Sequence, residues 1–409
     1  MWYDLAVRAL SCSTLVTCAI ESVPARGTWE PAEIRDAVVA WDDGAIVFAA
    51  DSSGWDGDID EERPGCTVIP GFVDCHTHLP FVGWRDDEFE ARLRGFSYRD
   101  LHGEGGIPRS ARMLAEASDE EVVSFCRPLL DEMLQHGTTA LELKTGYGLS
   151  VEAELRQARL AHRLTEQAAQ TATVTLLACH AVPPGITRED WVEAACTELI
   201  PQAAAEGLVD AVDVYVEDIA FAVEDLRRVA EAAAAAGLPL RCHADQLGPS
   251  GAAEAAASLG ARSADHLNHS GPEAGPALAR AGTAAVLLPA STLLLRAEPP
   301  PVEALADAGA ALAVATDFNP GTSPVLSMPL AVALACSLYG LTPGTALMAS
   351  TANPAWVLGL HDRLGTLEPG KRADFLVLDG DAFRTVPYRP GHNPVLEVYV
   401  AGARVAGES

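Results

Sequence analysis

Short apolar runs alternate with amphipathic segments through the middle of the chain. Residues 151–164 and 223–236 have helix-like patterns, and they separate strand-like runs such as 238–242 and 311–315. A regular alternation of strands and helices is typical of a parallel sheet covered by helices. The pattern therefore predicts an α/β fold built on parallel strands.

The two ends of the chain have a different pattern. Residues 36–49 alternate between apolar and polar on either side of Asp43-Gly44, which predicts a hairpin with an Asp-Gly turn. A further strand-like run follows the Pro369-Gly370 turn within residues 365–379. Strand-rich ends are therefore expected on both sides of the βα middle.

The length and composition set the size of the core. A chain of 409 residues with 49% apolar residues can bury one large barrel core and a smaller appended domain. The apolar run at residues 9–20 is preceded by Asp4 and lacks a basic segment before it, which disfavours a secretory signal. No apolar stretch reaches the roughly 18 to 20 residues that span a bilayer. We expect a cytoplasmic protein.

The charge balance and the cysteines narrow the function classes. There are 57 acidic against 28 basic residues, for a formal charge of -29, which disfavours nucleic acid and anionic membranes as partners. Nine cysteines, an odd number without a Cys-x-x-Cys motif, do not indicate a disulfide framework. A reduced protein with a small-molecule substrate fits both observations.

Two histidines at the end of an apolar run are the first candidate for chemistry. His76 and His78 follow the strand-like residues 68–73 and the Pro70-Gly71 turn signal within them. Side chains two positions apart on a strand point the same way and lie about 7 Å apart, so one metal ion can bridge them. Neutral imidazole is the commonest metal ligand. The alternative is a surface strand with two chance histidines.

Three more polar residues close apolar runs further along the chain. His243 ends the run that begins at residue 238, His266 follows a second run, and Asp317 ends the run at 311–316. Catalytic groups of a parallel barrel lie where its strands end and the βα loops begin. Each residue alone could be an ordinary buried side chain, but three of them after a His-x-His pair favour one shared site.

With these residues in place, the chain resembles a known family, the imidazolonepropionases of the amidohydrolase superfamily. His-x-His alone would indicate only the superfamily. The segments Lys144-Thr145-Gly146-Tyr147-Gly148-Leu149 and 316–324 narrow the resemblance to this branch. The resemblance covers nearly the whole chain through residues 70–78, 142–149, 179–184, 217–221, 243–246, 263–267 and 315–324.

The resemblance implies a fold and a domain division. The fold would be α/β, a (β/α)8 TIM-like barrel with a small β-sandwich domain built from the N- and C-terminal segments. The expected divisions are residues 1–65 for the N-terminal part of the sandwich, 66–362 for the barrel and 363–409 for the C-terminal part. Relatives are often homodimers, so a homodimer is also an expectation.

The resemblance also implies a site with one divalent metal per chain, zinc or iron. The implied ligands are His76, His78, His243 and Asp317. Imidazoles and a carboxylate suit a transition metal that lowers the pKa of a bound water, whereas magnesium prefers more oxygen ligands. Dinuclear relatives use a modified lysine at the end of the fourth strand, and the resemblance places His180 there in this chain, which favours one metal.

The implied reaction is hydrolysis of the cyclic amide of 4-imidazolone-5-propionate to N-formimidoyl-L-glutamate in histidine degradation. By resemblance, His266 polarises the carbonyl or moves a proton, and Asp317 accepts the proton of the attacking water. Arg85 would offer a bidentate fork to the propionate, unless it only pairs with Asp86, Asp87 or Glu88. The implied substrate-binding residues are Arg85, Tyr98, Tyr147, His180, Gln246, Asn319, Gly321 and Thr322.

Two departures from the family keep alternatives open. Gln246, also expected to act in catalysis, stands where many members have Glu, and an amide can orient a ring but cannot exchange a proton with it. This argues against a nucleobase deaminase. Residues 287–296 lack the usual glycine and aromatics after Pro289. Another five-membered cyclic amide with an acidic tail is therefore an alternative substrate, and a non-catalytic scaffold is a more distant one.

Overall fold

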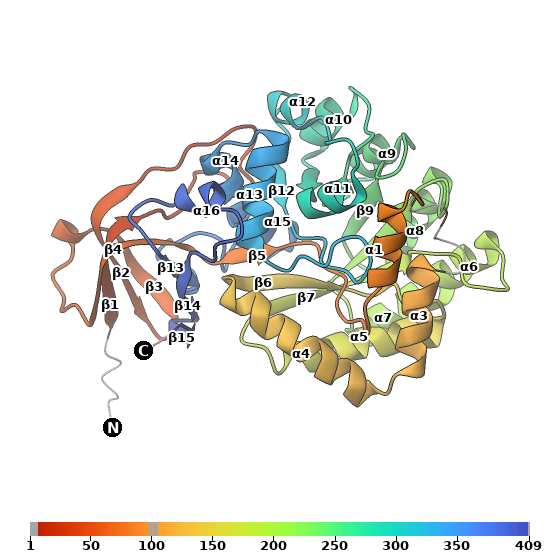
Figure 1. Ribbon diagram of the computed structural model, residues 1–409, viewed down its shortest axis with the longest axis horizontal. Coiled ribbons are helices and arrows are strands. Elements are labelled where there is room, and N and C mark those ends of the chain that lie inside the picture. Colours follow the sequence, from red (N-terminus) through yellow and green to blue (C-terminus); the bar gives the residue numbers. More distant parts are fainter. Residues whose placement is uncertain (1–6, 98–99, 101–104, 408–409) are drawn as a thin grey trace.

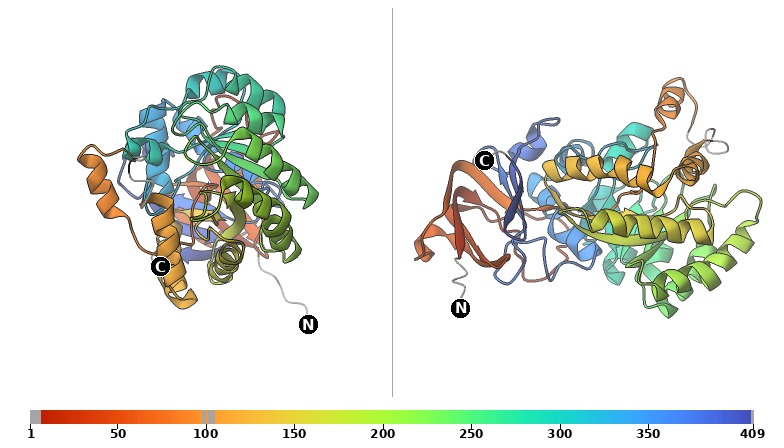
Figure 2. Two further views of the ribbon diagram at one scale, coloured as in Figure 1. Left: turned by 90° about the vertical axis from the view of Figure 1, so that its right-hand side faces the viewer. Right: turned by 90° about the horizontal axis from the view of Figure 1, so that it is seen from below.

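The structure is a computed structural model that describes residues 7–97, 100 and 105–407. Its strands fall into two separate sheets, a barrel-like parallel sheet and a smaller mixed sheet at one end of the molecule (Figure 1). The two further views show helices packed around the barrel and the chain termini both at the small sheet (Figure 2). The expected combination of an α/β barrel with a small β domain from both chain ends is confirmed.

Eight parallel strands form the larger sheet, and their spatial order is their order along the chain. These strands are β5 (Phe72–Asp74), β6 (Thr138–Lys144), β7 (Thr171–Cys179), β8 (Ala211–Val216), β9 (Leu240–Ala244), β10 (Ser263–His266), β11 (Ala284–Leu287) and β12 (Leu312–Val314). An isolated parallel bridge between Thr77 and Phe318 joins the first and last strands. Asp74 strengthens this join by accepting hydrogen bonds from the Thr316 hydroxyl (2.6 Å) and amide (3.1 Å).

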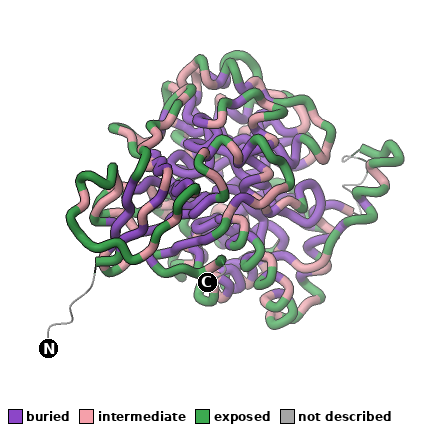
Figure 3. Tube along the Cα trace, turned by 60° about the vertical axis from the view of Figure 1, so that its left-hand side comes forward, coloured by how far each residue is buried: buried purple, intermediate pink, exposed green. Residues whose placement is uncertain are grey.

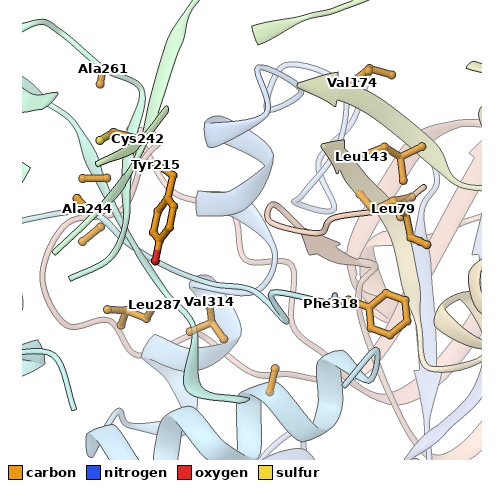
Figure 4. Packing of buried hydrophobic residues seen from close by; sticks show 14 of the residues in the cluster. Leu79, Leu143, Val174, Tyr215, Cys242, Ala244, Ala261, Leu287, Val314 and Phe318 are labelled. Carbon is orange, nitrogen blue, oxygen red and sulfur yellow. The ribbon is translucent and has the colours of Figure 1, made fainter. Parts of the chain in front are cut away.

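Helices connect the barrel strands and bury their apolar faces against them. The helix-like segments expected at 151–164 and 223–236 are confirmed as α5 (Val151–Thr165) and α8 (Val223–Ala235). Ser150 starts α5 by accepting a hydrogen bond from the Ala153 amide, which satisfies one of the free amides of the first turn. Burial is concentrated in the interior of the molecule (Figure 3), and the close view shows apolar side chains such as Leu143, Val174 and Leu287 packed there (Figure 4).

The other helices vary in length and position. In the barrel they are α1 (Asp86–Leu93), α3 (Gly106–Glu116), α4 (Asp119–Gln135), α6 (Arg188–Ala194), a π-helical turn (Ala195–Leu199), α7 (Ile200–Ala205), α9 (Ala252–Ser258), α10 (Ala274–Ala281), α11 (Pro289–Leu295), α12 (Val302–Asp307), α13 (Met328–Tyr339), α14 (Pro343–Met348) and α15 (Ala352–Val357). A short 3-10 turn (Ser52–Gly54) and α16 (Thr385–Tyr388) belong to the terminal segments. Among the described residues, no helix is long and apolar enough to cross a membrane.

The small sheet is made by both ends of the chain. Its strands, in spatial order, are β15 (Ala403–Ala406), β14 (Val395–Val400), β13 (Phe375–Leu378), β4 (Glu61–Pro70), β1 (Arg8–Leu15), β2 (Ile34–Asp42) and β3 (Ala45–Asp51). The hairpin expected over 36–49 is confirmed, since β2 and β3 pair antiparallel around Asp43-Gly44. All nine cysteines of the chain are described and free.

The chain passes from the small sheet into the barrel at Gly71. The residue lies between β4 and β5, and its amide donates a hydrogen bond to the Asp374 carbonyl (3.0 Å). A Cβ atom at position 71 would lie 2.0 Å from Thr139 Oγ1, so only glycine lets the two segments approach this closely. The domain divisions at 65/66 and 362/363 stay predictions.

Candidate active site

Four histidines and one aspartate meet at the carboxyl end of the barrel strands. His76 and His78 follow β5, His243 lies in β9, His266 ends β10 and Asp317 follows β12. All five side chains are buried. The parallel strands bring these residues together because their carboxyl ends lie at the same face of the barrel.

The donor atoms of this cluster converge on one small volume. His78 Nε2 lies 3.3 Å from Asp317 Oδ1 and 3.5 Å from His243 Nε2, and His76 Nε2 lies 3.6 Å from Asp317 Oδ1. One ligand atom from each of His76, His78 and Asp317 falls within 4.8 Å of the others, and the same holds for His76, His243 and His266. The cluster therefore has the spacing of a metal site.

The protonation states suit a metal as well. Burial lowers the pKa of His76 and of His78 well below the usual value, so their rings are neutral near pH 7. His76 Nε2 is buried and has no hydrogen-bond partner among the described residues. A buried ring nitrogen without a partner is costly unless a ligand engages it. These residues fit a divalent transition metal with imidazole and carboxylate ligands.

Arg85 is a cation that lines the cavity beside the cluster. It precedes α1, its side chain is buried, and it lines the same cavity as His78 and His266. Its Nε and Nη1 atoms are buried and have no hydrogen-bond partner among the described residues, although Glu88 Oε2 lies 3.8 Å from Nε. Asp87 pairs instead with Arg109 at 2.7 Å. Arg85 therefore has N–H groups left to donate to a ligand.

Asn319 organises the loop that follows β12. Its Oδ1 accepts hydrogen bonds from the amides of Gly321 (2.9 Å) and Thr322 (2.7 Å), and its Nδ2 donates to the Asp317 carbonyl (2.6 Å). Asn319 and Thr322 also line the cavity, whereas Gly321 lies against the Arg85 guanidinium. The loop thus connects the backbone of Asp317 with the segment that packs against the Arg85 side chain.

Of the remaining expected binding residues, three line the cavity and one lies outside the described part of the chain. Tyr147, His180 and Gln246 line the cavity. His180 stacks on His78 with ring centroids 5.3 Å apart, and its Nδ1 lies 2.9 Å from the Gly146 carbonyl oxygen. Tyr98 lies outside the described residues. All the other sequence-predicted site residues lie at or beside one cavity.

The apolar segment at 287–296 contains the end of β11 and helix α11, which lies beside the site. Leu294, Leu295 and Arg296 line a second cavity of about 340 Å³ together with residues of α1 such as Phe89. Gln246 lines both this cavity and the one that holds the histidines. The departure from the family pattern thus lines a cavity that adjoins the site at Gln246.

Comparison with known proteins agrees with this geometry. The model of the amidohydrolase family matches residues 67–405. An imidazolonepropionase of Rhizorhabdus wittichii is 42% identical over 369 residues, covering 88% of this chain and 92% of the relative. One from Deinococcus radiodurans is 46% identical over 342 residues, covering 83% and 84%.

This chain belongs to the amidohydrolase family, in its imidazolonepropionase branch.

Solved structures show the fold of this amidohydrolase. A zinc-bound adenosine deaminase from Xanthomonas campestris has a TM-score of 0.72 at 20% identity, covering 98% of this chain and 92% of that one. Guanine deaminase of E. coli has a TM-score of 0.71 at 16% identity, covering 98% and 100%. At these identities the likeness is one of fold.

The sequence patterns missed a group of buried charges beneath the histidines of this amidohydrolase. These residues are Glu142, Lys144, Asp213, Arg241 and Asp265, and each is at most 1% exposed. The signal that could have found them is the presence of charged residues inside otherwise apolar strand runs. Charged residues are almost never fully buried unless they are paired, so such a pattern indicates buried ion pairs. Ile107 and Tyr215 also line the cavity and were not predicted.

Proposed function

We propose that this amidohydrolase hydrolyses the cyclic amide bond of 4-imidazolone-5-propionate to give N-formimidoyl-L-glutamate, a step of histidine degradation. The observation that carries the proposal is Arg85, a buried guanidinium with unpaired N–H groups beside a cluster of metal-ligand type. A propionate needs such a fixed cation, because the formal charge of -29 on this chain would repel an anion at long range. The relatives named imidazolonepropionase support the same substrate.

One divalent metal, zinc or iron, would be held by His76, His78, His243 and Asp317. The convergence of their donor atoms and the neutral state of the imidazoles support this set. When bound, such a metal supplies Lewis acidity that lowers the pKa of a water molecule toward neutrality. The expectation that His180 takes the place of the modified lysine of dinuclear relatives is wrong, because His180 follows β7, the third barrel strand, whereas the fourth strand, β8, ends at Val216. The single ion therefore rests on the resemblance.

His266 and Asp317 would manage the proton of the attacking water. Burial lowers the pKa of His266 to about 3, so the ring is neutral at pH 7 and can donate one N–H to a carbonyl oxygen while its other nitrogen accepts a proton. Asp317 accepts the proton released as the water oxygen bonds to the carbonyl carbon. The proton then passes to the ring nitrogen as the C–N bond breaks, which leaves a carboxylate and an opened ring.

The cavity walls would orient the ring. Arg85 would bind the propionate carboxylate, and Tyr147, His180 and Gln246 would face the ring atoms from the segments that follow β6, β7 and β9. Gln246 can orient a ring N–H or carbonyl by hydrogen bonds, but it cannot protonate a ring nitrogen. This property disfavours the deamination chemistry of the structurally similar proteins. Asn319, Gly321 and Thr322 would complete the carboxylate pocket, and Tyr98 stays a prediction.

A different five-membered cyclic amide with an acidic tail is the second candidate. Helix α11 contributes Leu294 and Leu295 to the neighbouring cavity that shares Gln246 with the site, and the family usually has glycine and aromatic residues in this segment after Pro289. This change alters the surface that a ring meets on entry. Arg85 and the metal-type cluster would serve such a substrate equally well.

A cytoplasmic location and a homodimer complete the proposal. The nine free cysteines support a reducing compartment. The dimer rests on the resemblance alone.

The test is the loss of imidazolone absorbance when metal-analysed enzyme is added to freshly generated 4-imidazolone-5-propionate. We expect turnover that disappears in His243→Ala and persists in Gly271→Ala, whose new Cβ would meet nothing closer than 3.9 Å. Turnover of another acid-bearing lactam alone would favour the second candidate. A protein without stoichiometric metal and without turnover would overturn the hydrolase proposal.

A further inference from the structure

A layer of charged side chains lies inside the barrel beneath the histidine cluster. Glu142 and Lys144 come from β6, Asp213 from β8, Arg241 from β9 and Asp265 from β10. Barrel interiors are usually filled with branched apolar side chains, and burying charges costs free energy unless they are closely paired. A charged layer at this place therefore calls for a functional explanation.

The two cations bridge the three carboxylates. Lys144 Nζ lies 2.9 Å from Glu142 Oε2 and 2.7 Å from Asp213 Oδ2. Arg241 Nη2 lies 3.0 Å from Asp265 Oδ2, and Arg241 Nη1 also pairs with Glu142. Glu142 thus joins the two cations, and each aspartate is held by one of them.

Each aspartate also reaches a histidine of the site above. Asp265 Oδ2 lies 2.6 Å from His76 Nδ1, and Asp213 Oδ2 lies 3.0 Å from His243 Nδ1. A carboxylate favours the proton on the Nδ1 atom that faces it, through a hydrogen bond at His76 and through its negative charge at His243, where hydrogen-bond geometry is not met. The Nε2 lone pair of the same ring is then left for the cluster, where His243 Nε2 lies 3.5 Å from His78 Nε2.

We propose that Lys144 and Arg241 are positioning residues that hold Asp213 and Asp265, and through them orient His243 and His76 for metal binding. The inference rests on the proposed metal site and is independent of which cyclic amide is the substrate. It gives a role to Lys144, which the proposed reaction does not use. Partners of this kind typically change metal affinity about 10- to 100-fold.

The first test measures zinc affinity of the metal-stripped full chain by competition with a chromophoric chelator. The variants are Lys144→Met and the double variant Lys144→Met with Glu142→Gln, which removes one charge of each sign and leaves the sum of buried charges unchanged. The matched control is Arg372→Met, which breaks the pair between the partly exposed Arg372 and the buried Asp374 near the small sheet. We expect the dissociation constant to rise about 10- to 100-fold in both Lys144 variants and less than about twofold in the control.

The melting temperature of the metal-free protein separates positioning from stability. If Lys144 only stabilises the barrel, its variants will melt lower without metal yet bind zinc like the wild type, and the inference is wrong. Wild-type protein that binds no zinc would overturn the metal site and this inference together. Wild-type zinc binding without turnover would overturn only the proposed reaction.

A second measurement needs no variant of the charged layer. Histidine side-chain 15N chemical shifts of the metal-free wild type report which ring nitrogen carries the proton, with His76→Ala and His243→Ala used for assignment. We expect the Nδ1–H tautomer for both histidines. The Nε2–H tautomer in either ring would contradict the proposed orientation, even if the Lys144 variants fail to fold.

Discussion

At the scale of single residues, the placement of Arg85 depends on a glycine. Gly321 lies directly against the guanidinium, and a Cβ atom at position 321 would be 1.6 Å from Arg85 Nη2 and 2.2 Å from its Cζ. The buried guanidinium therefore occupies space that any other residue at position 321 would fill. This packing explains why the proposed carboxylate pocket needs a glycine beside its cation.

Substituting Gly321→Ala should push Arg85 out of its pocket and weaken substrate binding. Losing charge-assisted hydrogen bonds worth about 1.5 to 3 kcal/mol corresponds to a rise in KM of roughly 10- to 100-fold. We expect a smaller change in kcat and no change in metal content. Steady-state kinetics would check this, with Gly271→Ala as the control. An unchanged KM would contradict the assigned role of Arg85.

Glu217 gives the stability a pH dependence. The residue follows β8, and burial raises the pKa of its carboxyl group from the usual 4.5 to about 7, against the hydrogen bonds from the Leu247 and Gln246 amides. The folded state thus holds this proton more tightly than the unfolded state. The free energy of unfolding therefore falls as the pH rises from about 4.5 through 7, and the full penalty is present above 7.

The variant Glu217→Gln should remove this penalty. At pH 8 the variant should unfold at a higher urea concentration than the wild type, because its free energy of unfolding should be larger by up to about 3 kcal/mol. This difference in the free energy of unfolding should vanish toward pH 4.5. Urea unfolding at both pH values measures it. Glu231→Gln, on an exposed position of α8, should show no such pH-dependent difference. A stability difference between variant and wild type that grows toward low pH would contradict the raised pKa of Glu217.

At the scale of elements, Asp245 accepts hydrogen bonds from the Ala252 and Ala253 amides of the first turn of α9 (3.3 Å each) and shapes the loop after β9. Its Oδ1 accepts hydrogen bonds from the Ser250 amide (2.9 Å) and hydroxyl (2.7 Å), and its Oδ2 accepts one from the Ser270 hydroxyl (2.8 Å). The residue itself has a left-handed backbone conformation with φ of 54°. This conformation is more accessible to Asp and Asn than to most other residues.

The variant Asp245→Ala should therefore cost more than Asp245→Asn. Loss of a helix cap costs about 0.5 to 2 kcal/mol, and alanine adds the strain of the left-handed backbone, whereas asparagine keeps an acceptor and tolerates that backbone. We also expect a lower kcat in Asp245→Ala because the neighbouring Gln246 lines the cavity. Denaturant unfolding and kinetics would check both effects. Equal losses in the two variants would rule out the backbone contribution.

At the scale of the whole molecule, the site lies on the seam where the barrel closes. Strands β5 and β12 meet through one bridge, Thr77 with Phe318, and the His78 amide donates to the Phe318 carbonyl at 2.8 Å. The proposed ligands His76 and His78 lie on one side of this seam, and Asp317 lies on the other. A metal ion bound between them would stabilise the closure of the barrel as well as take part in the reaction.

Metal removal should therefore loosen the seam and lower the melting temperature. A ligand present at 100 times its dissociation constant stabilises by about 2.7 kcal/mol, which for a chain of 409 residues corresponds to a drop of roughly 3 °C on its removal. Dialysis against a chelator, followed by calorimetry and hydrogen exchange at residues 75–79 and 315–319, measures this effect. Zinc should restore the protection and magnesium should not. Unchanged hydrogen exchange in the metal-free protein would contradict a role of the metal in stabilising the barrel closure.

The sequence alone determined the elements and the face of the barrel on which the site lies. Apolar spacing of 3.6 residues located α5 and α8, and runs ending in His243, His266 and Asp317 located strand ends. These features depend on neighbours along the chain, so a local pattern records them. Parallel strands then place all their carboxyl ends at one face, which is why scattered residues could be assigned to one site.

Only the tertiary structure decided which atoms meet. Asp265 reaches His76 across 189 positions and Lys144 reaches Asp213 across 69, so no local pattern could pair them. The packing of Arg85 against Gly321 likewise depends on a loop brought back by barrel closure. Such contacts follow from strand register and the closing of the sheet, because the distances between side chains on different strands exist only once the barrel is formed.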